Sequence, residues 1–98
     1  MLNFPSYTTT THLNDGSYST VYRGYRNSDN LPVVMKILKK ENPLPVEVAR
    51  FRREYEMTKM FDSDGIIKVI GLEKSGNTLA IVLEDFGGES IYRHIHSG

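Results

Sequence analysis

The chain has 98 residues, and its twelve basic and twelve acidic side chains give a formal net charge of zero. This length fits one small domain and excludes most complete catalytic folds. The balanced charge lacks the basic excess of nucleic-acid-binding domains, and the absence of cysteine excludes disulfides, thiolate catalysis and cysteine-ligated zinc. No apolar run reaches the roughly 18 residues of a membrane span, and no signal-peptide pattern opens the chain. We therefore expect a cytoplasmic protein with no membrane span, no nucleic-acid partner and no metal ligands of its own.

The first half of the chain predicts three strands. Residues 6–13 are rich in β-formers and predict the first strand. A cluster of turn residues at 14–17 follows, and the alternating segment 21–26 predicts a second strand that forms a hairpin with the first. After a second turn cluster, the apolar run 33–38 predicts a third strand, in which Lys36 is the one charged residue.

The second half predicts one helix and two further strands. Residues 47–61 are dense in helix formers and have acidic residues near their start, which predicts a helix whose buried face the pattern leaves open. Residues 66–73 and 78–84 predict a hairpin, and Ser90 would cap a further short helix over 90–96. The order β-β-β-α-β-β predicts an α+β fold, a five-stranded antiparallel sheet with one inserted helix.

The turn between the first two strands is the first candidate site. Its backbone N–H groups would approach phosphates closely because the residues around Gly16 are small, and Asn14 tolerates a positive φ better than most residues. Leu13 and Val21 flank the turn, where they would form an apolar wall for a base. Taken alone, the same residues are also typical of an ordinary hairpin turn with no binding role.

Two charged residues and a strand end are the other candidates. Lys36 is costly to bury without a partner and would serve as a phosphate donor, but an edge-strand lysine reaching solvent fits the same pattern. Glu54 on the helix would pair with Lys36, or would lie in solvent among neighbouring arginines. The segment 83–88 ends a strand in two glycines, which would expose backbone groups to a purine edge or simply end the strand.

The order and spacing of these parts resemble the N-terminal lobe of a protein kinase. The family signature has a G-x-G-x-x-G-x-V loop, a lysine in a V-A-I-K strand and a glutamate on the next helix. The corresponding segments here read Asn14-x-Gly16-x-x-Ser19-x-Val21 and Val33-Val34-Met35-Lys36, followed by Glu54. The resemblance covers residues 7–95 or so, which implies that 1–98 is a partial kinase domain with the C-terminal lobe absent.

The resemblance implies ATP as the cofactor and assigns a role to each matched residue. The residues that would cover the phosphates are Asn14, Gly16, Ser17 and Tyr18. The residues that would enclose adenine are Leu13, Val21, Met35 and, as gatekeeper, Leu83. Lys36 would bind the α- and β-phosphates and Glu54 would hold Lys36, while the backbone of Glu84 and Phe86 would read the adenine edge.

The H-R-D catalytic loop, and the D-F-G metal motif that follows it in the family, have no counterpart in this order of segments. The resemblance therefore implies the ATP-binding lobe of a Ser/Thr-type signalling kinase on a truncated or split chain that does not transfer phosphate alone. Mg-ATP is expected only with a complete C-terminal lobe. The partners would then be a protein substrate and a second lobe, on another chain or on a missing extension.

A narrower resemblance concerns the kinase segment that opens very large bacterial signalling proteins, ahead of ATPase and sensor histidine kinase regions. The run 51–55 and the segment 83–88 carry it. Two alternatives stay open. One is a non-catalytic half-kinase that regulates or docks through its apolar cleft face. The other is an unrelated β-rich binding domain in which Lys36 and Glu54 never meet.

Overall fold

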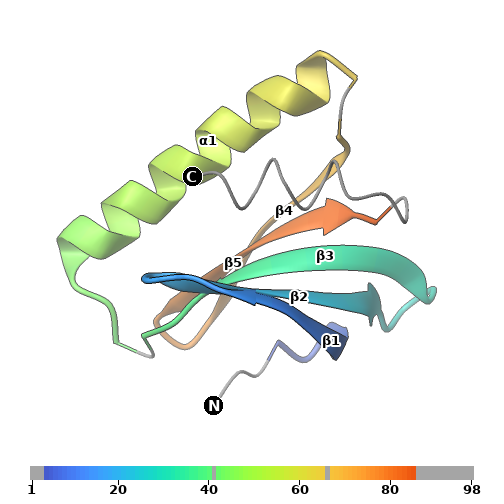
Figure 1. The fold of residues 1–98 in the computed structure, drawn as a ribbon, viewed down its shortest axis with the longest axis horizontal. Helices are drawn as coiled ribbons and strands as arrows, with labels where there is room; N and C mark the ends of the chain where they lie inside the picture. Colours follow the sequence, from blue (N-terminus) through green and yellow to red (C-terminus); the bar gives the residue numbers. More distant parts are fainter. Residues whose placement is uncertain (1–3, 41, 66, 86–98) are drawn as a thin grey trace.

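The computed structural model describes residues 4–40, 42–65 and 67–85, which form five strands and one helix. In chain order they are β1 (Tyr7–Asp15), β2 (Ser19–Arg26), β3 (Leu31–Leu38), α1 (Pro45–Ser63), β4 (Val69–Ser75) and β5 (Thr78–Glu84). The strands form one antiparallel sheet in the order β1-β2-β3-β5-β4, and α1 lies along one side of it (Figure 1). The predicted α+β architecture and its β-β-β-α-β-β order are thereby confirmed. The predicted helix over 90–96 lies outside the described residues.

Several element boundaries differ from the sequence-based expectation. Asn14 and Asp15 belong to β1, because they pair with Val21 and Thr20 of β2, and only residues 16–18 turn the chain. Asn14 therefore has ordinary strand geometry and no positive φ. Likewise, β4 begins three residues later and ends two residues later than predicted. Its end is later because the turn to β5 takes only two residues, with Gly76 at φ 60°.

Each face of the sheet carries its own apolar core, as the two-residue period of a strand requires. The helix-side core is the cluster Val21, Val34, Leu38, Phe51, Ile67, Leu79, Ile81 and Leu83. The opposite core is the cluster Phe4, Val33, Met35, Ile37, Ala80 and Val82. Because β3 and β5 contribute to both clusters, they read as nearly continuous apolar runs, and Lys36 is the one charged side chain within this stretch of β3.

Gly24 permits β1 and β2 to lie as close as they do. A Cβ atom at this position would stand 2.0 Å from the carbonyl oxygen of Thr8 and 2.9 Å from the Cα of Thr9. Both are backbone atoms of β1, so no rotamer change relieves the overlap. The hairpin that carries the glycine turn therefore depends on a glycine in the middle of β2.

Local signals at its N-terminus start α1 two residues earlier than predicted. Pro45 occupies the first turn, where the missing N–H costs nothing. The N–H of Leu44 donates to the Glu47 carboxylate at 2.8 Å, and Lys40 lies 3.1 Å from the same carboxylate. The hydrogen bond from Leu44, followed by the Lys40 ammonium, lowers the pKa of Glu47 below its usual value. Pro43 therefore precedes the helix, and Pro45 is its first residue.

One stripe of α1 packs on the sheet. Phe51 is buried, and Val48, Tyr55 and Phe61 pack against the helix-side core at helical spacing. Thr58 continues this stripe as its polar member and donates from Oγ1 to the Glu54 carbonyl at 2.8 Å. Among the described residues, no helix combines the length and the apolar character that crossing a bilayer requires.

Candidate functional site

Lys36 and Glu54 meet on the helix side of the sheet. The Lys36 side chain is 9% exposed, and its Nζ lies 3.2 Å from Oε2 of Glu54. The register sets Lys36 of β3 between Val21 of β2 and Ile81 of β5, in the middle of the sheet rather than at an edge. An edge-strand lysine reaching solvent is therefore the wrong interpretation. The pair also contradicts the alternative of an unrelated domain in which the two residues never meet.

An apolar wall lies beside this ion pair. Val21, Val34 and Leu83 belong to the helix-side core, and Leu13 packs against it. Val34 pairs with Arg23 and Leu83 in neighbouring strands, one strand repeat away from Lys36. Four apolar side chains from β1, β2, β3 and β5 thus share one face with the Lys36 ammonium, an arrangement that suits a flat base attached to a phosphate chain.

The expectation that Met35 belongs to this wall is wrong. Met35 lies in the opposite core with Val33 and Ile37, since successive side chains of β3 point to opposite faces. Val34 takes the place that we assigned to Met35. The two-residue period alone identifies it, because Val34 is two positions before Lys36 and must share its face.

The turn at residues 16–18 is closed by its own hydrogen bonds. The Gly16 N–H donates to the Ser19 carbonyl at 2.8 Å, and a Cβ on Gly16 would lie 3.2 Å from the same oxygen. Ser17 and Tyr18 are exposed. Glycine at position 16 thus permits the tight turn, and its N–H is already used within the hairpin.

Asp15 connects this turn to the end of β3. Its carboxylate lies 2.8 Å from Nζ of Lys39 and accepts a hydrogen bond from Oγ1 of Thr20 at 3.0 Å. The Lys39 ammonium and the Thr20 hydroxyl lower the pKa of Asp15 below its usual value. The backbone N–H of Lys39 also donates to the Tyr18 carbonyl at 2.9 Å, so the turn has a defined position above β3.

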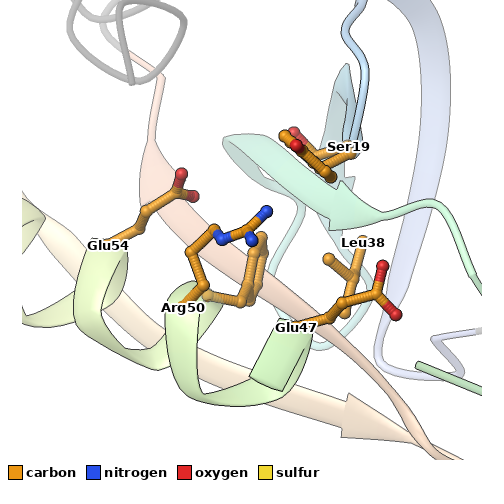
Figure 2. A pocket seen from close by; sticks show the side chains of 7 residues that line it. Ser19, Leu38, Glu47, Arg50 and Glu54 are labelled. Carbon is orange, nitrogen blue, oxygen red and sulfur yellow. The ribbon is translucent and has the colours of Figure 1, made fainter. Parts of the chain in front are cut away.

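A small hollow separates this turn from α1. Figure 2 shows Glu47, Arg50 and Glu54 projecting from α1 toward the strands that carry Ser19 and Leu38. The Arg50 guanidinium carbon lies 4.6 Å from the centre of the Tyr18 ring, within cation–π range. The same hollow is therefore lined by Glu54, the partner of Lys36, and by the Arg50–Tyr18 contact between helix and turn. Sequence patterns did not indicate the second of these.

Backbone hydrogen bonds hold the segment formed by the last residue of β5 and the residue that follows it. The Glu84 N–H donates to the Lys68 carbonyl and the Asp85 N–H to the Pro32 carbonyl, each at 2.9 Å. The Asp85 carboxylate is 5% exposed and lies 2.6 Å from Nε of Arg23. Of the two residues expected to read a purine edge, Glu84 lies at this segment, and Phe86 lies outside the described residues.

The letters Asp-Phe-Gly at positions 85–87 match the family's metal motif by composition only. Asp85 comes directly after β5, and its carboxylate is paired with an arginine. Within residues 4–40, 42–65 and 67–85, no three His, Asp or Glu side chains gather as a metal site would need. The described residues therefore do not fit a magnesium site.

Comparison with known proteins identifies the family. The family model of the protein kinase domain matches residues 7–98. The RAF proto-oncogene serine/threonine-protein kinase of Xenopus laevis is 34% identical over 84 residues. That match covers 86% of this chain, which spans 12% of the relative's length. The sheet, the inserted helix and the match over residues 7–98 lead to one conclusion: the chain belongs to the protein kinase family.

Proposed function

We propose that the chain is the ATP-binding lobe of a Ser/Thr-type protein kinase that acts in signalling. The Lys36–Glu54 ion pair carries the proposal. A lysine in the middle of a sheet is expensive to bury, and the partly exposed carboxylate of Glu54 holds its ammonium near an apolar wall. That arrangement suits a point charge that binds phosphate oxygens while the base lies against Val21 and Val34.

The remaining roles follow from position. Leu13 and Leu83 would complete the base pocket with Val21 and Val34, and the turn around Gly16 would lie over the phosphates. The Glu84 N–H already donates to the Lys68 carbonyl, so Glu84 would bind the purine edge through its own carbonyl. The family's catalytic base and magnesium ligands would come from residues outside those described here, so the described residues bind and orient the nucleotide and do not themselves complete the transfer.

Nucleotide titration of the full-length protein tests this function. Lys36→Ala should weaken ATP binding about tenfold or more, because a hydrogen bond to a charged group is worth roughly 1.5–3 kcal/mol. Lys40→Ala is the matched control, since Lys40 is exposed and pairs with Glu47 outside the wall. ATP binding that Lys36→Ala leaves unchanged would refute the assignment. Partner capture without any nucleotide dependence would favour the non-catalytic regulatory module instead.

The narrower resemblance to the opening segment of large bacterial signalling kinases is part of the same proposal. The run 51–55 on α1 and the segment 83–88 support it. The mass of the native protein in its source cells is the direct test, since that architecture requires a chain many times longer than 98 residues. The protein substrate and a cytoplasmic location likewise remain predictions.

A further inference from the structure

An ion pair between distant segments lies at the end of the wall farther from Glu54. Arg23 of β2 and Asp85 after β5 are 62 residues apart, and Nε of Arg23 lies 2.6 Å from Oδ2 of Asp85. The Asp85 carboxylate is 5% exposed, while 38% of the Arg23 side chain is exposed. A carboxylate that is nearly enclosed needs a charged or hydrogen-bonding partner, so losing this contact costs more free energy than losing a surface ion pair.

The register shows which part of the sheet this pair crosses. Arg23 pairs with Val34, and Val34 pairs with Leu83, so the three form one row across β2, β3 and β5. Arg23 is two residues after Val21 and therefore shares its face. The Arg23 side chain thus runs along the wall, past Val34, to the residue that follows Glu84.

Contacts from several segments hold residues 84 and 85. The Glu84 and Asp85 N–H groups donate to the carbonyls of Lys68 and Pro32, and the Asp85 carboxylate pairs with Arg23. The backbone bonds are made to β3 and to the residue before β4, whereas the ion pair reaches β2, which carries Val21. The ion pair therefore links the purine-edge segment to the wall of the base pocket.

We propose that Arg23 is a positioning residue for the nucleotide: by holding Asp85, it fixes the Glu84–Asp85 segment at the distance from Val21 and Val34 that a purine requires. The inference rests on the proposed ATP-binding function. It predicts that the pair affects recognition of the base and leaves the phosphate end at Lys36 unaffected. A merely structural pair would change stability and alter both ends alike, or neither.

Binding of two ligands by the full-length protein separates these outcomes. ATP has a base and phosphates, whereas inorganic tripolyphosphate has only the phosphate part. Arg23→Met should weaken ATP binding about tenfold, in line with the loss of one charge-assisted contact, and should leave tripolyphosphate binding within twofold. Arg26→Met is the matched control, because Arg26 lies on the same strand and pairs with the exposed Asp29 at 2.7 Å. It should change neither affinity.

A double-mutant cycle keeps the test decisive if Arg23→Met folds poorly. Asp85→Asn removes the ion pair without leaving an unpaired buried charge, so its effect on ATP should be similar or smaller. The double variant Arg23→Met/Asp85→Asn should be no worse than Arg23→Met alone, because both changes break one contact. The inference is overturned if the two single substitutions weaken ATP binding additively in the double variant. It is also overturned if Arg23→Met weakens ATP and tripolyphosphate binding equally, or leaves ATP affinity unchanged. If the wild-type protein does not bind ATP, the proposed function fails; if Lys36→Ala loses ATP and Arg23→Met does not, only this inference fails.

Discussion

Replacing Gly24 with alanine should separate β1 from β2. The new Cβ would lie 2.0 Å from the Thr8 carbonyl oxygen, and ordinary contact begins at 3.4 Å, so the β1 backbone must shift by about 1.4 Å. Overpacking of this kind costs roughly 1–3 kcal/mol, and a clash with backbone atoms belongs at the upper end. For a domain of this length, that cost lowers the melting temperature by about 10–20 °C.

Thermal unfolding followed by circular dichroism checks this result. Gly71→Ala is the control, because Gly71 also lies in a strand and a Cβ there meets no atom within 4 Å. The control should melt within a few degrees of the wild type. A Gly24→Ala variant as stable as the Gly71→Ala variant would refute the close approach of β1 and β2, and with it the placement of Leu13 beside Val21.

Three further predictions concern the faces of the sheet, the helix and the response to acid. Val34→Leu should weaken ATP binding severalfold, because the larger side chain crowds the base pocket. Met35→Leu, in the opposite core, should leave ATP affinity unchanged and cost under about 1.5 kcal/mol of stability. ATP titration and denaturant unfolding of the two variants measure these effects. Phe51→Ala should cost about 3–5 kcal/mol, while Met57→Ala on the exposed side of the same helix should be nearly neutral in the same unfolding assay. The Arg26 guanidinium lowers the pKa of Asp29 to about 2, so the ionised Asp29 carboxylate stabilises the fold above about pH 4 and loses that effect as the pH falls toward 2. The difference in unfolding free energy between the wild type and Asp29→Asn should therefore shrink over the same pH range. A difference that does not change with pH would contradict this prediction.

The order of elements could be predicted because local patterns determine it, whereas the Lys36–Glu54 pair was expected from the resemblance to the kinase lobe and not from a local pattern. Turn clusters divide the strands, and a charged residue in an apolar strand indicates a specific partner. The strand limits near Asn14 and Ser75 could not be predicted, since cross-strand pairing determines where a strand ends and the sequence gives only the residues of the turn. The buried stripe of α1 could not be predicted either, because the polar Thr58 interrupts its apolar spacing and donates a hydrogen bond to the Glu54 carbonyl of the same helix.

The error at Met35 has a different origin. Strand parity fixes its face, and applying the two-residue period from Lys36 backward would have selected Val34. The contacts of Arg23 with Asp85 and of Arg50 with Tyr18 join residues far apart in the sequence. Such pairs depend on the final packing of the sheet and helix, and no local pattern indicates them.

Amide hydrogen exchange with and without ATP tests the central claim most directly, that a nucleotide lies over the wall of Leu13, Val21 and Val34 with its phosphates at Lys36. In the full-length protein, ATP at a concentration near the wild-type Kd should slow exchange in segments 13–21 and 33–36, and Lys36→Ala should lose most of that protection at the same ATP concentration. Equal protection of these segments in the wild type and in Lys36→Ala at that concentration would contradict the account, and so would binding of ATP that leaves the segments unprotected.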